Sequence, residues 1–359
     1  MPDPTVSPER HTHRDDTYTE RAFGPASHQS RYVFRLLRLF AHPFIVHWRP
    51  TRRGIRFLRW LYGTVIQVPA MRGTTIEHRS LGGVPVEWTT TARAAEARHG
   101  QRVILYLHGG GYVFGAPRTH RNLASRLSHV TATPVANVDY RMPPQTSLRQ
   151  GQDDVLAAYL GLIDAGYAGE GILVAGDSAG GGHAARLVLR LIEEGHPGPA
   201  GVVLLSPWTD LTASGASLTS NSRFDFVIVK EILDRIARAL APTDENRRDW
   251  RNSPAFAPDE LLAQFPPTLV QVGSRETLRD DGLAFARRLG DAGATVEAQI
   301  YAGQGHVVAM WSGTPDSRRA MQEIFDWLKL VLPDERDPSD PTVAELAEAD
   351  EAGGNRPLD

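Results

Sequence analysis

The sequence predicts an α/β protein with a mostly parallel central sheet that is covered by helices on both faces. Short apolar runs rich in Val, Ile and Leu alternate along the chain with amphipathic segments of helical length. Because these runs are apolar throughout, and not only at every second residue, they are typical of parallel strands that are buried on both faces. The 359 residues, 41% of them hydrophobic, are enough for one sizeable core.

The expected elements follow one another through the middle of the chain. Apolar runs predict strands at 84–90, 102–107, 134–139, 171–176, 201–205, 268–272 and 295–300. Helical spacing predicts helices at 118–130, 147–165, 179–195 and 318–332. Residues 206–266 interrupt the alternation and contain one amphipathic helix, at 229–240. An insertion of this length in a regular α/β series usually forms a lid or cap.

The two ends of the chain differ from its middle. Residues 1–30 are polar and residues 333–359 are acidic, so we expect a disordered head and a disordered tail. Residues 31–72 hold nine arginines, no acidic residue, and many leucines and aromatic residues. We interpret this segment as helices that cover the body and turn their arginines to water. Peripheral contact of an amphipathic helix with an anionic membrane surface is the alternative.

Composition excludes several classes of function. The net charge of -3 gives no reason to expect a nucleic-acid partner. The absence of cysteine excludes disulfides, zinc–thiolate sites, iron–sulfur clusters and a cysteine nucleophile. The sequence has no secretory signal and no apolar run long enough to span a membrane, which fits a cytoplasmic location. We expect a small-molecule substrate, and a homodimer is left open.

The strongest local motif is Gly176-Asp177-Ser178-Ala179-Gly180, which has the form G-x-S-x-G. It lies directly between the strand expected at 171–176 and the helix expected at 179–195. A sharp strand-to-helix turn exposes the middle serine at the carboxyl edge of the sheet, and the flanking glycines let neighbouring backbone approach. This context predicts that Ser178 is a nucleophile, since a turn without function is the weaker interpretation.

A second motif, His108-Gly109-Gly110-Gly111, follows the strand at 102–107. Acyl transfer places negative charge on the substrate oxygen, and fixed backbone N–H groups stabilise it. The expected donors of this oxyanion hole are the N–H groups of Gly109, Gly110 and Ala179. A phosphate-binding loop is the rival interpretation. HGGGYVFG does not match G-x-G-x-x-G, because its last glycine is one position late, and no Walker sequence is present.

A serine hydroxyl needs a base, and three histidines follow Ser178. His183 lies in the helix after the nucleophile and should point away from its Oγ atom. His196 lies past the end of that helix. His306 remains, in Gly303-Gln304-Gly305-His306, in a loop at the carboxyl end of the strand at 295–300. We therefore predict that His306 is the base.

The third member of such a triad is an acid between the serine and the histidine in the chain. Glu276 is the first acidic residue after the strand at 268–272. Asp280 and Asp281 lie where a helix begins, and helix N-capping is a sufficient role for them. Asp210 and Asp225 belong to the insertion and are weaker candidates. We choose Glu276.

Together these motifs resemble the bacterial hormone-sensitive-lipase-like family of α/β-hydrolases. The resemblance runs from about Arg102 to His306 and is carried, in the family's order and spacing, by HGGGYVFG, VDYRMPP, GDSAGGG, SPWTDL, GSRETLRDDG and GQGH. It implies an α/β-hydrolase fold and a carboxylesterase that needs no cofactor and no metal and acts on short to medium acyl esters. It also implies a cap made of residues 31–72 and about 211–260, on a hydrolase domain at 73–332.

Some residues depart from the family's pattern. The family usually has Asp where Glu276 stands, and Glu occurs in a branch that resembles monoterpene lactone hydrolases. Gln145 replaces the Glu of YRLAPE, and the Asn usual after SAGG is displaced, with Gly182 and His183 in that region. These differences affect the expected substrate more than the nucleophile.

The mechanism expected from these parts is hydrolysis through an acyl-enzyme. Lactone hydrolysis and amide hydrolysis would use the same triad. A non-catalytic receptor resembling the gibberellin receptors is the rival of another class, and the presence of His306 argues against it. Aromatic residues near the motifs should wall an apolar pocket, with plain core packing as the alternative; they are Tyr112, Phe114, Tyr140 and Trp208.

Overall fold

The computed structural model describes residues 12–14, 17–40, 42–48, 51–64, 67–97 and 101–332. Its centre is a ten-stranded sheet in the order β1-β2-β10-β9-β8-β7-β5-β6-β4-β3. The pairs β1–β2, β4–β6 and β3–β4 are antiparallel, and the other six pairs are parallel. The strands are β1 (Thr12–Arg14), β2 (Tyr18–Phe23), β3 (Thr75–Leu81), β4 (Val84–Thr90), β5 (Val103–Leu107), β6 (Val135–Val138), β7 (Ile172–Asp177), β8 (Gly201–Leu205), β9 (Thr268–Gly273) and β10 (Val296–Tyr301).

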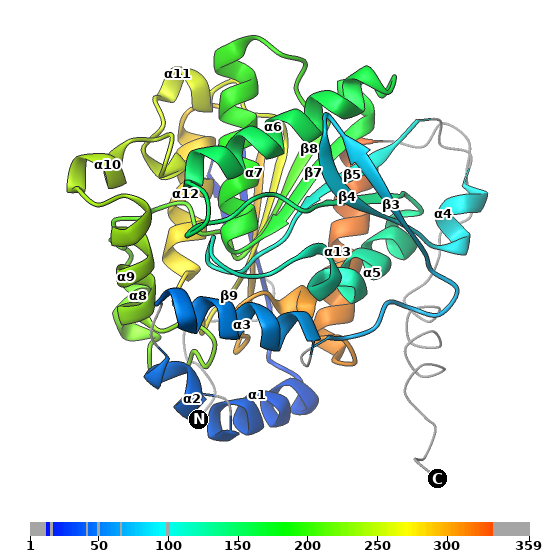
Figure 1. Ribbon diagram of the computed structural model, residues 1–359. Helices are drawn as coiled ribbons and strands as arrows, with labels where there is room; N and C mark the ends of the chain where they lie inside the picture. The colour runs from blue at the N-terminus through cyan, green and yellow to red at the C-terminus, as the bar shows by residue number, and fades with distance from the viewer. Residues whose placement is uncertain are drawn as a thin grey trace.

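Helices cover both faces of this sheet, as the sequence predicts (Figure 1). Alternate residues of one strand serve different cores: Leu105 packs with α6 and α7, whereas Ile104 packs with α5 and α13. The central strands are therefore apolar throughout, because neither of their faces meets water. The covering helices are α4 (Ala92–Glu96), α5 (Arg121–Thr131), α6 (Leu148–Asp164), α7 (Ala179–Glu194), α12 (Arg279–Asp291) and α13 (Pro315–Val331).

The remaining helices lie in the two segments expected to form the cap. The arginine-rich segment forms α1 (His28–Phe40), α2 (His42–His47) and α3 (Arg52–Thr64), which lie together below the sheet in the view of Figure 1. The insertion forms α8 (Ser217–Ser220), α9 (Lys230–Leu240), α10 (Asp244–Arg248) and α11 (Asp259–Leu262). Among the described residues, no helix combines the length and the apolar character that crossing a membrane requires.

The structure corrects the expectation of a disordered head. Strand β2 pairs with β10 in parallel, from Tyr18 opposite Val296 to Phe23 opposite Tyr301. The sequence of β2, YTERAF, has few apolar residues, so its own pattern gave no strand signal. Tertiary contacts hold it instead: the Phe23 ring stacks on Tyr301 at 4.9 Å, and Arg21 forms ion pairs with Glu297 and Glu323 at 2.9 and 2.7 Å. Strand β1 and the first residues of α1, from His28, also lie in the expected head, whereas residues 1–11 and 15–16 and the tail at 333–359 lie outside the described residues.

Parallel strands bring their carboxyl ends to one edge of the sheet. The loops that follow β5, β7, β8, β9 and β10 all begin at this edge. They contain, in that order, His108 to Gly111, Ser178, Ser206, Glu276 and His306. Residues that are up to about two hundred positions apart in the chain are therefore placed side by side by the fold.

The role of β2 can be tested with Phe23→Ala. Phe23 is 4% exposed, and removing a buried phenyl ring should lower the free energy of unfolding by about 3 kcal/mol. Urea unfolding followed by circular dichroism measures this loss. The matched control is Phe57→Ala, whose ring is 55% exposed and whose loss should change stability by less than about 0.5 kcal/mol. Equal effects of the two substitutions would contradict a structural role for β2.

Candidate active site

Ser178 lies in a strained turn between β7 and α7. Its φ and ψ are 53° and -121°, a region that residues with a side chain rarely occupy. Its N–H donates to the carbonyl of Leu205 at 2.8 Å. A Cβ atom at Gly180 would overlap the carbonyl of Leu107, and one at Gly176 would overlap the backbone of Gly180. The two glycines of the motif are therefore required by the close approach of backbone that fixes this turn.

The oxyanion loop differs from the expectation at one position. The N–H of Gly109 donates to Asp177 Oδ1 at 2.9 Å, so it is already occupied. The N–H groups of Gly110, Gly111 and Ala179 make no hydrogen bond within the described part of the chain. Gly110 and Gly111 both have positive φ, 127° and 58°, a backbone conformation that favours glycine. Among the described residues, the N–H groups of Gly110, Gly111 and Ala179 are therefore available to an oxyanion, whereas that of Gly109 is not; the role of Gly110 and Ala179 stays a prediction.

His306 and Glu276 come together although thirty positions separate them in the chain. His306 Nδ1 lies 3.5 Å from Glu276 Oε2, and both side chains are buried. This distance is that of an ion pair and is longer than a strong hydrogen bond. Burial alone would lower the pKa of His306, but the carboxylate of Glu276 beside it raises that pKa above its usual value. Burial raises the pKa of Glu276, which the neighbouring imidazole partly offsets.

Ser206, which the sequence analysis did not single out, links this pair to the nucleophile. Its hydroxyl donates to Glu276 Oε2 at 2.7 Å and accepts from the N–H of Val307 at 2.9 Å. It follows Leu205, whose carbonyl binds the Ser178 N–H. A continuous series of contacts therefore runs along the sheet edge from the nucleophile to the histidine. The position of Ser206 directly after β8, at the start of SPWTDL, is the feature of the sequence that could have identified it as a site residue.

The insertion holds the loop that carries Glu276. Asn221 donates through Nδ2 to the carbonyls of Ser274 and Glu276 at 3.0 and 2.9 Å. Asp225 Oδ2 accepts from the N–H of Thr277 at 2.8 Å. The carboxylate of Asp225, which is buried next to the site, is therefore used to fix backbone.

Asp280 and Asp281 also bind the insertion. Asp280 Oδ2 accepts from the N–H of Ser217 at 2.8 Å, and Asp281 accepts from the N–H groups of Thr209 and Asp210 at 3.0 and 3.1 Å. The N-cap of α12 is Leu278, so the expected capping role is wrong, although a structural role holds. Burial and the charge of Asp210 raise the pKa of Asp281 to about 8.

The other histidines after the nucleophile lie elsewhere. His183 is buried in α7, with its ring 4.7 Å from that of Tyr140, and burial lowers its pKa well below the usual value. His196 is partly exposed beside Glu194 at 3.3 Å. Of the three, only His306 faces a fully buried carboxylate.

Three of the four aromatic residues expected to wall a pocket are packed in the core. Tyr112, Tyr140 and Trp208 are each no more than 2% exposed. Tyr112 donates its hydroxyl proton to the carbonyl of Trp208 at 2.7 Å and accepts from Arg186 at 2.9 Å. Tyr140 stacks on His108 with ring centroids 4.4 Å apart. Core packing is therefore the better interpretation of these three, and Phe114, which is half-buried, stays a candidate for the pocket.

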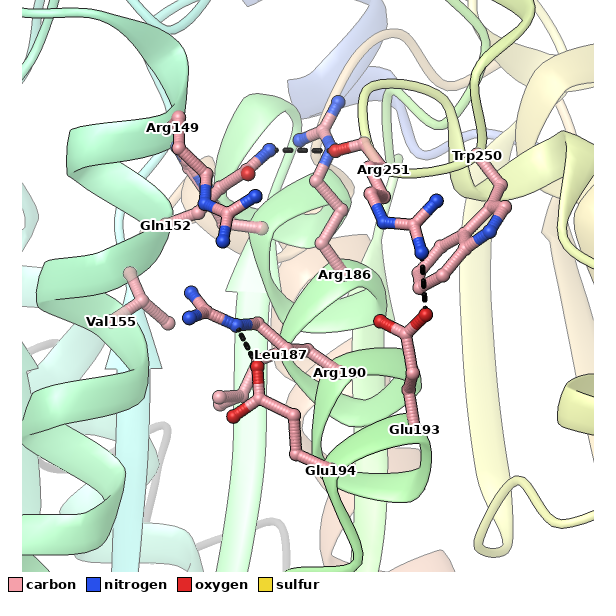
Figure 2. A pocket seen from close by; sticks show the side chains of 11 residues that line it. Arg149, Gln152, Val155, Arg186, Leu187, Arg190, Glu193, Glu194, Trp250 and Arg251 are labelled. Carbon is pink, nitrogen blue, oxygen red and sulfur yellow. Dashed lines mark hydrogen bonds and ion pairs between the residues drawn. The ribbon is translucent and has the colours of Figure 1, made fainter.

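Arg186 also borders a cleft between α6 and α7 that Figure 2 shows from close by. The charged groups in it are largely paired: Arg190 with Glu194 at 2.5 Å, and Arg251 with Glu193 at 2.5 Å. Neither Ser178 nor His306 lines it. We therefore assign this cleft to the packing of α6 on α7, and the candidate active site to the carboxyl edge.

The amino-acid sequence is similar to those of known hydrolases. The family with the alpha/beta hydrolase fold matches residues 104–310. An acetyl-hydrolase from Streptomyces hygroscopicus is 36% identical over 245 residues, which cover 68% of this chain and 79% of that protein. An esterase from Acinetobacter venetianus is 32% identical over 63% of this chain and 74% of its own length.

Solved structures of hydrolases have the same fold as this chain. An esterase from the bacterial hormone-sensitive lipase family superimposes with a TM-score of 0.76 at 33% identity, over 86% of this chain and 100% of that one. A hormone-sensitive lipase from a metagenome library gives a TM-score of 0.77 at 31% identity with the same coverage.

Ser206→Ala tests whether the hydroxyl of Ser206 positions the Glu276–His306 pair. A hydrogen bond to a charged group contributes about 1.5–3 kcal/mol, so kcat for a p-nitrophenyl ester should fall about tenfold or more, with KM little changed. Ser222→Ala is the control, because its exposed hydroxyl donates only to the carbonyl of Thr219. Wild-type kcat in Ser206→Ala would show that the hydroxyl is not needed.

Proposed function

This chain belongs to the α/β-hydrolase-fold family, in its bacterial hormone-sensitive-lipase group, and we propose that Ser178, His306 and Glu276 form the triad through which it acts. The protein is a serine carboxylic-ester hydrolase. The observation that supports the triad most directly is the buried His306–Glu276 pair, reached by the series of contacts that begins at Ser178.

In the first half-reaction, Ser178 Oγ attacks the ester carbonyl while His306 Nε2 takes the hydroxyl proton. The carbonyl oxygen gains negative charge, which the N–H groups of Gly110, Gly111 and Ala179 stabilise. Glu276 stabilises the imidazolium that forms. The carbon–oxygen bond to the alcohol then breaks, the alcohol takes the proton from His306, and the acyl group remains on Ser178.

In the second half-reaction, water replaces the alcohol. His306 takes a proton from water, which attacks the acyl carbonyl over the same three N–H groups. Collapse releases the carboxylic acid and returns the proton to Ser178. The cycle uses water, the side chains of Ser178, His306 and Glu276, and the three backbone N–H groups.

The cap proposed for this site combines α1 to α3 with the insertion. The Phe34 ring of α1 lies 5.2 Å from that of Phe226 in the insertion and 5.6 Å from Trp311. Trp311 in turn donates from Nε1 to the carbonyl of His306 at 2.9 Å. Ile55 of α3 is buried in one hydrophobic cluster with Tyr112, from the loop after β5, and with Leu211 and other residues of the insertion. Such a cover over the carboxyl edge supports a substrate of limited size, with short to medium acyl groups.

Lactones are cyclic esters, and the same acyl-enzyme would serve them. Glu276, in the place where the family usually has Asp, is the specific reason to include them. Rates on a panel of p-nitrophenyl esters of increasing acyl length, lactones and anilides would rank the three substrate classes.

Ser178 should be the covalent nucleophile. A fluorophosphonate probe should add to Ser178 in the wild type, and mass spectrometry of the peptide locates the adduct. Ser178→Ala should abolish labelling and lower kcat by on the order of 10⁴-fold or more. Ser214→Ala, on a hydroxyl that donates to Asp210, is the control and should keep both labelling and rate. Labelling that persists in Ser178→Ala would reject the assignment.

Glu276→Gln should affect both the rate and its pH dependence. Loss of the carboxylate should lower kcat by roughly 10⁴-fold, the value typical of a serine protease triad. Because the neutral imidazole is the base, kcat/KM is lost as pH falls through the pKa of His306. Glu276 raises that pKa, so the wild-type acid limb should lie above about 6.5 and should move to lower pH in Glu276→Gln.

Asp280→Asn is the matched control for Glu276→Gln. It keeps the size of the side chain and weakens the contacts of Asp280 with the N–H of Ser217 and with Arg279, so it should lower stability by about 1 kcal/mol with little effect on kcat. If Asp280→Asn cripples kcat and Glu276→Gln does not, the acid lies one helical turn further along the chain.

A further inference from the structure

Helices α1 and α3 carry large apolar side chains on their outer faces. Six of the eight large apolar residues that are exposed in the described part of the chain lie on these two helices. On α1 they follow the spacing of a single helical stripe, and on α3 the rings of Phe57 and Trp60 lie 5.9 Å apart. The six are Tyr32, Leu36, Leu39, Phe40, Phe57 and Trp60. Clustering of this kind, unlike single exposed apolar residues, marks an interaction surface.

Arginines flank this apolar surface. Six exposed arginines lie on the same two helices, and no ion pair links any of them to an acidic residue within the described ranges. They are Arg31, Arg35, Arg38, Arg52, Arg53 and Arg56. The whole segment 31–72 contains no acidic residue that could neutralise them. The outer surface of α1 and α3 therefore combines exposed aromatic and leucine side chains with strong positive charge.

The inner faces of the same helices are engaged, which fixes the orientation of the outer ones. Phe34 packs against Phe226 and Trp311, and Ile55 is 5% exposed. Arg59 donates from Nε to the carbonyl of Val113 at 2.8 Å. The apolar stripe is therefore not a core surface that has lost its partner, because a different stripe of each helix already packs on the body.

This surface lies beside the proposed active site. Phe34 of α1 contacts Trp311, which binds the carbonyl of His306. In Figure 1, α1, α2 and α3 lie at the end of the molecule towards which the parallel strands point. A flat partner bound to α1 and α3 would therefore lie at the end of the molecule that carries the proposed active site.

We propose that the outer face of α1 and α3 binds the surface of a membrane that contains anionic lipids. The aromatic and leucine side chains would enter the boundary between headgroups and acyl chains, and the arginines would bind lipid phosphates. A second copy of the chain fits this face less well, because a two-fold contact would bring two unneutralised arginine clusters together. Binding goes beyond the proposed function and requires no intact triad.

Vesicle co-sedimentation of the full-length Ser178→Ala protein tests the proposal without lipid hydrolysis. It should bind vesicles of equal parts phosphatidylcholine and phosphatidylglycerol, bind pure phosphatidylcholine far more weakly, and lose binding at high salt. Adding Arg35→Gln and Arg56→Gln should weaken binding on the order of tenfold or more. Adding Leu39→Ser and Trp60→Ser should weaken it by at least as much.

The matched control is Arg251→Gln with Arg287→Gln. Both side chains are exposed, and they lie near the C-terminal ends of α7 and α12, away from the carboxyl edge. This pair removes the same charge and should leave vesicle binding unchanged. A control that weakens binding as much as Arg35→Gln with Arg56→Gln would mean that net charge, and not this face, is responsible.

Two results would overturn the proposal. One is the absence of binding to the mixed vesicles. The other is a dimer in analytical ultracentrifugation that Leu39→Ser with Trp60→Ser dissociates, which would make the face an interface between copies. Fluorophosphonate labelling of the same variants with Ser178 restored reports on the triad separately, so failure of vesicle binding leaves the proposed function in place.

Discussion

The buried carboxylate of Asp177 joins the loop at Gly109 to the turn that carries Ser178, the two segments on which the proposed acyl transfer depends. It accepts from the N–H of Gly109 and from the hydroxyl of Tyr106, at 2.9 and 2.7 Å, and His120 lies within 3.3 Å. Burial opposes its charge, but His120 and Tyr106 lower the pKa of Asp177 overall. Because Asp177 precedes the nucleophile, this one group sets the distance between the oxyanion loop and Ser178. The loop's first glycine is used for anchoring, which leaves the next two to face a substrate.

The acid and the base depend on a second set of contacts, and these come largely from the insertion. Asn221 and Asp225 fix the loop that carries Glu276, and Asp281 binds Thr209 and Asp210 in the same inserted segment. The insertion therefore fixes the loop that carries Glu276, the proposed acid, in addition to forming part of the proposed cap. Movement of the insertion would move the Glu276 carboxylate relative to His306, whose pKa depends on it.

Helices α1 and α3 each have an inner face that packs on the body of the protein and an outer face that is exposed. The inner face packs on Phe226 and Trp311 and contacts the loop after β5 through Val113. The outer face carries the exposed aromatic, leucine and arginine side chains. If the outer face binds lipid, the same helices cover the proposed site and also place the enzyme at the membrane surface, where apolar esters are concentrated. Segment 31–72 would then serve as cap and as membrane contact together, two roles that its composition alone presented as alternatives.

The sequence by itself determined the features whose causes are local. Gly176 and Gly180 around Ser178, the glycines after β5, and the apolar parallel strands follow from steric rules within a few residues, and the fold they predict is confirmed. Order along the chain and position after a strand predicted Glu276 and His306 as the acid and the base, and the structure places these two side chains 3.5 Å apart. Tertiary structure decided what depends on distant partners. Strand β2 forms because β10 lies beside it, and the N–H of Gly109 is occupied because Asp177 is near. Tyr112 and Trp208 lie in the core because Arg186 and the carbonyl of Trp208 bind the Tyr112 hydroxyl, and the carbonyl of Asp210 binds the Trp208 indole N–H. No local pattern encodes such pairings, since each needs a partner brought from elsewhere in the chain by folding.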